Sequence, residues 1–434
     1  MKRAIAALVS LALSFTLATL VDVTGDTQSF SETYPAVVCP PTLTGLSSQI
    51  SISSRKTQFQ SLENQNGKTT PFNALRYPVF KDSLVISASG VTPVIWQSRA
   101  GSWAGGTICS GPISSQWFVG GSSDVTTRGR LVVINSGLSE AIVDVQAFSE
   151  NGKQPLKSLN LKSRSYTVVS LDSLATGDKQ LAVHVVPRSG RINAFMIDEL
   201  GAGLKALGGD FVNPITLESK LLVIPAIPNQ LVKKGQEATG GHTLRILAPS
   251  DMDANFAVEI LSADGRFVPL GFGARKILAG IVTEFSLSPK ISASAFAVRI
   301  TSNEPVVAAI SSNVTIKGRK DFVWSVPTPA LVPMSIAVTG LSPLIAFAGD
   351  LIDIKMQVTF VNGETTLTTI KGSDIATWRV PKEARSISVL EASAFSYAGA
   401  LIASNNGYGY IPITPGSLLT KVEIPRSNIR VLNP

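Results

Sequence analysis

The sequence of 434 residues contains only two histidines and two cysteines. A Ser-His-Asp hydrolase would have only His184 or His242 as its base, and no G-x-S-x-G stretch supplies the nucleophile. Zinc hydrolysis is disfavoured as well, because the chain has no H-E-x-x-H motif and no His/Cys cluster. His184 lies in an alternating strand pattern and His242 in a loop-like "GGHT" stretch, so we expect neither to be catalytic.

Charge is also scarce, since charged residues make up 16% of the chain against the ~25% usual in soluble domains. The net charge is +8, but the basic residues are mostly single and lack the interleaved aromatic residues of single-strand nucleic-acid platforms. We therefore expect no nucleic-acid partner, and at most weak attraction to anionic envelope polymers. The stretch "GFGARK" (271–276) lacks the third glycine and the βαβ context of a dinucleotide site, so no cofactor is expected.

One long apolar run occurs in the chain, at residues 4–21 behind Met-Lys-Arg. A signal peptide cleaved after Ala18 or Gly25 and an uncleaved membrane anchor both fit this pattern, and both export the rest. Residues 1–25 are therefore predicted to be a signal peptide or an N-terminal anchor helix, and the only segment that contacts a membrane.

The two cysteines, Cys39 and Cys109, both follow this export signal. In an oxidising compartment two isolated cysteines usually pair. We predict a disulfide that closes a loop of roughly 70 residues and stabilises the fold by about 4 kcal/mol in the chain-entropy model. The protein is accordingly expected to be extracytoplasmic.

Beyond residue 25 the chain consists of short apolar or alternating runs separated by turn signals, which predict β-strands. "AIVDVQAFSENGKQ" (141–154) resembles "NFAVEILSADGRFV" (255–268), and three segments align at one shift of 115 residues, which places Val143 opposite Val258. A weaker copy begins at "MQVTFVNGETTL" (356–367). The sequence predicts an all-β chain of tandem immunoglobulin-like β-sandwich domains. The expected division is an N-terminal β-rich domain with the cysteine pair at 26–125, repeats at 126–218 and 219–330, and a degenerate repeat at 331–434.

Aromatic residues make up only 7% of the chain, with three tryptophans grouped in its N-terminal third and tyrosines near its end. Aromatic rings beside asparagine in loops can stack on sugars, which makes these residues candidate glycan contacts. The alternative is packing around the disulfide and along a terminal strand. The candidates are Trp96, Trp103, Trp117, Tyr408 and Tyr410.

A cation site has one weak candidate in the stretch "PSDMDANF" (249–256). Asp251 and Asp253 have the alternate spacing of oxygen ligands in calcium loops. The alternative is an ordinary turn rich in Asp and Asn, and the sequence leaves the metal undetermined.

Several motifs together carry a family resemblance. "WFVGGSS" (117–123), "LVVINSG" (131–137) and "AIVDVQAFSENG" (141–152) follow the pattern W-[YF]-x-x-G-S-[ST], L-x-L-x-N-P, V-x-V with a later Gly. With "VIPAIP" (223–228) and "DFVWSVPTPAL" (321–331), the chain resembles an uncharacterised family of secreted or N-terminally anchored actinobacterial proteins over roughly residues 35 to 335. Ser136 stands where the pattern has proline. The resemblance implies export and a β-sandwich-like fold, and it carries no catalytic residues over.

We therefore expect an exported, non-enzymatic cell-envelope protein with a structural, adhesive or glycan-binding role. Its expected partners are cell-wall or envelope polymers, while its oligomeric state stays open. The alternative is an envelope-glycan enzyme, or an accessory subunit, that uses a pair of carboxylates in its N-terminal third.

Overall fold

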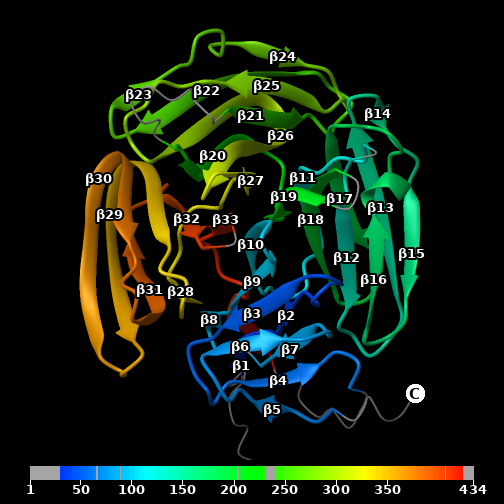
Figure 1. Ribbon diagram of the computed structural model, residues 1–434, viewed down its shortest axis with the longest axis vertical. Helices are drawn as coiled ribbons and strands as arrows, with labels where there is room; N and C mark the ends of the chain where they lie inside the picture. The colour runs from blue at the N-terminus through cyan, green and yellow to red at the C-terminus, as the bar shows by residue number, and fades with distance from the viewer. Residues whose placement is uncertain are drawn as a thin grey trace, which may run out of the picture. The chain divides into compact units, whose positions relative to one another are not determined.

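The structure is a computed structural model (Figure 1), and no α-helix occurs in the part of the chain that it describes. Strands dominate, with one 3₁₀ turn at η1 (Leu171–Ser173), so the predicted all-β class is confirmed. Within the described residues no helix is long and apolar enough to cross a membrane. The predicted signal or anchor segment 1–25 lies outside them. The described residues are 30–423 without 65–66, 88, 125, 203–204, 231–240 and 406, with side chains described for 34–420 apart from 202–206.

The chain forms two compact units. The described part of the smaller unit is an antiparallel pair of β1 (Phe30–Thr33) and β34 (Thr420–Glu423), in which Phe30 is opposite Glu423. The larger unit, residues 34–418, contains four β modules, and it carries all the sites described below.

The first module is a sandwich of two four-stranded sheets, ordered β10-β9-β3-β6 and β2-β7-β4-β5. Cys39 ends β2 in one sheet and Cys109 follows β10 in the other. Their S–S distance is 2.01 Å, which confirms the predicted disulfide. Both cysteines are buried in the core between the sheets. The strands are β2 (Val37–Cys39), β3 (Ser47–Ser51), β4 (Gln58–Ser61), β5 (Thr70–Pro71), β6 (Arg76–Val79), β7 (Leu84–Ile86), β9 (Val94–Arg99) and β10 (Trp103–Ile108).

The second module pairs the sheet β11-β17-β13-β14, with β15 beside β13, against the sheet β16-β12-β18-β19. Its first strand, Gln116–Val119, pairs with β17. These residues therefore belong to this sandwich and not to the predicted domain 26–125. The strands are β11 (Gln116–Val119), β12 (Arg130–Asn135), β13 (Ala141–Ser149), β14 (Gly152–Lys153), β15 (Lys157–Leu161), β16 (Ser165–Ser170), β17 (Leu181–Pro187), β18 (Ile192–Ala202) and β19 (Lys205–Val212).

The third module is organised by one strand of 22 residues, β26 (Ala295–Ile316). Its first part pairs with β20 and β22, and its later part pairs with β21 and β27. This single strand thus makes the pairings that β17 and β18 make separately in the second module. The other strands are β20 (Ser219–Pro228), β21 (His242–Leu247), β22 (Ala254–Ser262), β23 (Gly265–Phe267), β24 (Arg275–Ile277), β25 (Thr283–Leu287) and β27 (Arg319–Ser325).

The fourth module has the strand order β33-β32-β29-β31-β28-β8, with β30 beside β29. Its last strand, β8 (Val91–Thr92), comes from the first part of the chain and runs parallel to β28. The other strands are β28 (Met334–Ala337), β29 (Leu344–Phe360), β30 (Thr365–Arg379), β31 (Ala384–Ala392), β32 (Tyr397–Ala403) and β33 (Tyr408–Pro412).

The internal duplication is present, but its shift is not constant. β13 starts at Ala141 and β22 at Ala254, a difference of 254 − 141 = 113, and their burial patterns are identical. Downstream the shift of 115 holds, because His184 and Arg299 are opposite Gln146 and Glu259 respectively. A two-residue offset leaves the period-two alternation of a strand unchanged, so alternation alone does not separate 113 from 115. The turn glycines Gly152 and Gly265 are 113 residues apart and carry the correct shift.

The four modules close into a ring within the larger unit. Each module ends in a hairpin whose last strand, β10, β19, β27 or β33, lies at the centre (Figure 1), and these central strands contact one another. Small residues permit the approach, since a Cβ on Gly407 would lie 2.0 Å from the backbone nitrogen of Ala104. The domains predicted in tandem along the sequence are therefore packed against each other.

The disulfide is expected to be the main covalent support of the first module. Replacing both Cys39 and Cys109 with serine should lower the free energy of unfolding by about 2–5 kcal/mol. Urea denaturation followed by tryptophan fluorescence measures this loss. The unmodified chain should show a similar loss in reductant, whereas the double variant should be insensitive to it. Equal stability of both chains in oxidising buffer would contradict the assignment.

Candidate functional site

The central strands are joined by side chains in addition to backbone ladders. Asp210 on β19 accepts a hydrogen bond from the backbone N–H of Trp324 at 2.9 Å, and Asp321 on β27 accepts one from Gly209 N–H at 3.0 Å. Asn213 donates to the carbonyl oxygen of Gly106 at 3.2 Å, as it does to that of Tyr410. The first three bonds connect modules that follow one another around the ring, and the bond from Asn213 to Tyr410 connects the second module to the fourth. They provide partners for buried backbone groups at strand edges.

Burial of these acids changes their titration. Burial raises the pKa of Asp321 to about 7, and it raises the pKa of Asp210 well above the ordinary range. The pKa of Asp198, a buried neighbour on β18, is raised for the same reason. The ring centre therefore holds carboxyl groups that favour their protonated form.

An arginine bridges each interface between successive modules. Between the first and second modules, Arg99 forms a 2.5 Å ion pair with the buried Glu199. Between the third and fourth, Arg299 pairs with Asp350 at 2.7 Å. Between the fourth and first, the Nη1 of Arg76 donates to the carbonyl oxygen of Thr339 at 3.1 Å.

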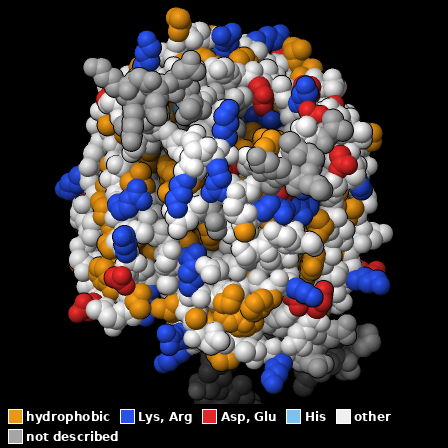
Figure 2. Space-filling model, viewed as in Figure 1, with side chains coloured by type: hydrophobic (Ala, Val, Ile, Leu, Met, Phe, Trp, Pro, Cys, Tyr) orange, Lys and Arg blue, Asp and Glu red, His pale blue; other side chains and the backbone are white. Residues whose placement is uncertain are grey.

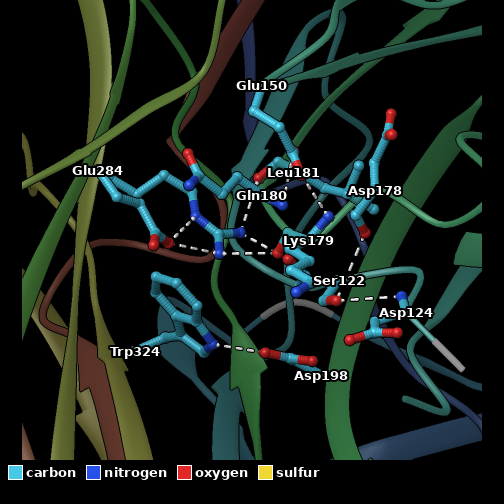
Figure 3. A network of polar contacts seen from close by, with 12 residues as sticks. Ser122, Asp124, Glu150, Asp178, Lys179, Gln180, Leu181, Asp198, Glu284 and Trp324 are labelled. Carbon is cyan, nitrogen blue, oxygen red and sulfur yellow. Dashed lines mark hydrogen bonds and ion pairs between the residues drawn. The ribbon is translucent and has the colours of Figure 1, made fainter. Parts of the chain in front are cut away.

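The second and third modules are joined by Arg245, which is only 5% exposed. Figure 3 labels the residues around it, among them Leu181, Glu284 and Trp324. Its Nη1 donates to the carbonyl oxygens of Gly121 at 2.5 Å and Leu181 at 3.1 Å. Nε and Nη2 both donate to Oε1 of Glu284, at 2.9 and 2.7 Å. The guanidinium also lies 4.9 Å from the ring centre of Trp324. This network fixes the "GGSS" loop of the second module against β21 of the third.

A polar pocket of about 270 Å³ opens beside this network. Asp198 lines it and accepts a hydrogen bond from the indole N–H of Trp324 at 2.9 Å, while Glu284 is held by Arg245. These two acids are thus already engaged, and Asp198 is only 4% exposed. A third acid, Asp124, also lines the pocket. The remaining lining is rich in hydroxyl groups: Ser122, Thr126, Thr127, Thr243 and Ser311.

A larger groove, of about 520 Å³, lies on the outer face of the sheet β10-β9-β3-β6. We call it the β3–β6 groove. Arg76, Pro78 and Phe80 are alternate residues along β6 and its end, so they project to this face while Tyr77 and Val79 enter the core. Phe80 is 76% exposed. The lining residues are Thr42, Leu46, Ser47, Ser48, Gln49, Arg76, Pro78, Val79, Phe80, Trp96, Ser98, Ser404 and Asn405.

Polar groups of the groove are held in place by each other. Ser47 and Ser98 share a 3.0 Å hydrogen bond between their hydroxyls, and Arg76 Nε donates to Oε1 of Gln49 at 2.5 Å. Asn405, from the loop before β33, forms part of the wall contributed by the fourth module. The groove is therefore a sheet face with an exposed ring, hydroxyls, an amide and a guanidinium.

The predicted aromatic contacts separate into different environments. Trp103 and Tyr410 are fully buried, so no ring face is available to a ligand there. Trp117 is also buried, and it packs on Phe148 and His184 instead of on the disulfide. Tyr408 is partly buried against a hydrophobic core. Trp96 lines the β3–β6 groove with the small exposed part of its ring.

Both histidines are held by packing. His242 begins β21, contrary to the expected loop, and it shares a 2.8 Å hydrogen bond with Ser312; burial lowers its pKa to about 4. His184 stacks on Trp117 with ring centres 3.9 Å apart and shares a 2.8 Å hydrogen bond with Ser115. Burial lowers its pKa, although the Glu218 carboxylate opposes this. That carboxylate accepts the indole N–H of Trp117.

The candidate cation ligands are engaged otherwise. Asp253 forms a 2.8 Å ion pair with Lys276 and accepts the Ala279 N–H at 3.0 Å, while Asp251 is exposed in the same loop. In the described part of the chain no group of three or more His, Cys, Asp and Glu residues could hold a metal ion. The turn interpretation accounts for what Asp253 does.

Residues 87–365, more than half of the chain, match a family described as "Family of unknown function (DUF5719)". The chain belongs to the DUF5719 family. This confirms the expected membership of an uncharacterised family, and a comparison with curated proteins found no match.

Two solved structures show distant likeness to this DUF5719 protein. "Crystal Structure of Thermotoga maritima 1070" is 11% identical, covering 23% of this chain and 92% of that chain, with a TM-score of 0.21. A tetra-tandem repeat in the extending region of a large adhesion protein is 8% identical, covering 92% of this chain and 95% of that chain, with a TM-score of 0.09. Likeness at these scores carries no argument about fold or function.

Residues that sequence reasoning missed carry much of the geometry. Arg245 lies in "HTLRIL" and Asp210 in "GGDFVN", where each resembles an ordinary surface polar residue. Phe80 and Arg76 lie in "RYPVF", whose alternation shows that they share a face but not that the face is open. The available signal was the recurrence of an aspartate, Asp210 and then Asp321, in the last strand of two central hairpins.

Asp321 is expected to make stability depend on pH. Its pKa is about 7 in the fold, against roughly 4 in an unfolded chain. Its contribution is therefore full below pH ~4 and is lost as the pH rises towards 7, by up to about 1.4 kcal/mol per pH unit. Asp321→Asn should remove this slope from urea-denaturation curves recorded between pH 5 and 7.

The matched control for Asp321 is Asp253→Asn. The Asp253 carboxylate is held ionised by Lys276, which lowers its pKa, so its contribution is lost only on acidification and is constant between pH 5 and 7. An unchanged slope in Asp321→Asn would contradict the role of the buried carboxyl.

Arg245 is expected to be a major stabiliser of the interface between the second and third modules. Arg245→Leu leaves Glu284 and several carbonyl oxygens without their donor, which should cost about 3–5 kcal/mol. Arg275→Leu, at an exposed arginine that rests over Phe272, should cost below about 1 kcal/mol. Differential scanning calorimetry of both variants tests this, and equal losses would contradict the bridging role.

Proposed function

We propose that this DUF5719 protein is an exported, non-enzymatic binder of envelope polysaccharide, and that the β3–β6 groove is its binding site. The disulfide indicates an oxidising, extracytoplasmic environment. A signal peptide or anchor at residues 1–25 and an actinobacterial origin remain predictions of the sequence. Secretion and envelope location are part of this proposal.

The observation that carries the proposal is the exposed Phe80 ring on a hollowed, polar sheet face. The C–H face of a pyranose packs on an aromatic ring, while its hydroxyls need donors and acceptors at the sides. Ser47, Ser98 and Gln49 provide such groups on the same face. A concave site with an apolar floor and a few fixed polar groups is the usual form of a ligand site.

The enzymatic alternative requires two free carboxylates that flank a bound sugar. The residues that line the β3–β6 groove include no Asp or Glu. In the smaller pocket, which Asp124 also lines, Asp198 is bound to Trp324 and Glu284 to Arg245. These engagements favour binding without bond cleavage.

Replacing Phe80 with alanine should weaken polysaccharide binding about tenfold, which corresponds to about 1.4 kcal/mol, because the stacking surface is removed. Affinity electrophoresis in gels that contain purified cell-wall polysaccharide measures the change. Phe395, which is 71% exposed and outside the groove, provides the matched control Phe395→Ala. Equal retardation of both variants and the unmodified chain would place binding elsewhere, and release of reducing ends would support the enzymatic alternative.

A further inference from the structure

Of the interface arginines, Arg76 has the most unusual environment. Arg99, Arg245 and Arg299 each form an ion pair with a carboxylate within 4 Å. Among the described residues Arg76 has no such ion pair, and it donates hydrogen bonds to the neutral oxygens of Gln49 and Thr339. A half-buried guanidinium without a counter-ion has lost hydration without gaining a compensating charge.

The desolvation of Arg76 is visible in its titration. Burial lowers the pKa of its guanidinium from the ordinary value, and no carboxylate contributes in the opposite direction. For Arg130, which faces Glu199, the carboxylate does oppose the effect of burial. Arg76 nevertheless stays charged at neutral pH, because guanidinium ionisation lies far above it.

The charge that the lining residues give the groove is positive. Of the described residues that line it, Arg76 is the only charged one. Two further cations are fixed at its wall, because Lys317 donates to the side chain of Asn405 at 2.8 Å and Arg319 to its carbonyl oxygen at 3.0 Å. Figure 2 shows Lys and Arg side chains over the middle of the viewed face, with Asp and Glu mainly towards its edges. The positive charge at the groove is thus left unneutralised by lining residues.

From these observations we infer that the β3–β6 groove selects an anionic polysaccharide, whose carboxylate or phosphate group binds Arg76 while a sugar ring packs on Phe80. This inference rests on the proposed function and names its ligand class. A guanidinium offers two parallel N–H donors that match either oxyanion. Lys317 and Arg319 would add attraction for neighbouring anionic groups along the same polymer.

The test compares the affinity of the purified full chain for four polymers. The probes are polygalacturonate, which carries carboxylates, poly(glycerol phosphate), neutral dextran, and single-stranded RNA. We expect binding to at least one of the first two to exceed binding to dextran about tenfold or more, and to weaken as NaCl rises from 50 to 500 mM, because salt screens charged contacts. The two anionic probes show which oxyanion is preferred.

Variants locate the charge. Arg76→Gln should weaken binding to the preferred anionic polymer about tenfold. Arg76→Lys should keep the salt dependence and lose part of the affinity, since lysine keeps the charge but lacks the two parallel N–H donors of the guanidinium. Arg55→Gln, an exposed arginine of the same module outside the groove lining, makes the same change of charge and should have no effect. Lys317→Gln alters an exposed side chain, and we expect it to weaken binding about two- to threefold without changing the melting temperature.

The outcomes separate the two claims. Salt-independent binding of dextran equal to that of the anionic polymers, with Lys317→Gln and both arginine variants unaffected, overturns the anionic preference and leaves polysaccharide binding intact. Absence of binding to dextran, polygalacturonate and poly(glycerol phosphate) by folded protein overturns both. Tighter binding to RNA than to any glycan polymer also overturns the inference, because it would assign the groove to a different macromolecule.

Discussion

Edge strands at the centre of the ring impose the main physical requirement on this fold. A strand at the end of a sheet presents backbone groups that need partners once water is excluded. Here Asp210, Asp321 and Asn213 provide those partners across module boundaries. Each bond connects two modules, so a module cannot rotate without leaving buried groups unpaired. The groove and the pocket lie between modules, and their walls therefore depend on these central contacts.

The outer contacts follow a different principle, which is charge compensation. Arg99 and Arg299 join modules through carboxylates, whereas Arg245 pairs with Glu284 of its own module and joins the second module through carbonyl oxygens. Truncation of either member of such an ion pair would leave a poorly hydrated charge behind. Arg76 occupies a corresponding place between modules and lacks the carboxylate. Structural support and ligand recognition can thus use one residue type, and the presence or absence of an internal counter-ion separates the two uses.

The sequence was sufficient for the class of the fold and for its covalent link. Period-two alternation with Asn-Gly and Asp-Gly turns predicts strands and hairpins locally, and two cysteines allow one intramolecular pairing. The groove could not be predicted in this way, because Phe80 and Trp96 have similar local patterns and differ in exposure only through residues far away in the chain. Gly106 and Gly409 pack so closely on the Trp96 ring that a Cβ at either position would crowd it, whereas Phe80 remains exposed.

The parallel pair of β8 and β28 has a consequence for how the chain reaches its folded state. Strand β8 lies between β7 and β9 of the first module in sequence but completes the sheet of the fourth, and Thr92 accepts a hydrogen bond from Gly416, 324 residues away. Long-range contacts of this kind slow folding. In a chain that emerges from its amino end, β8 has no partner until β28 is made, and the ring of central strands stays open until β33 arrives. Assembly of the ring is therefore a late, cooperative event, and the period before it is when the exposed edges are most vulnerable to aggregation.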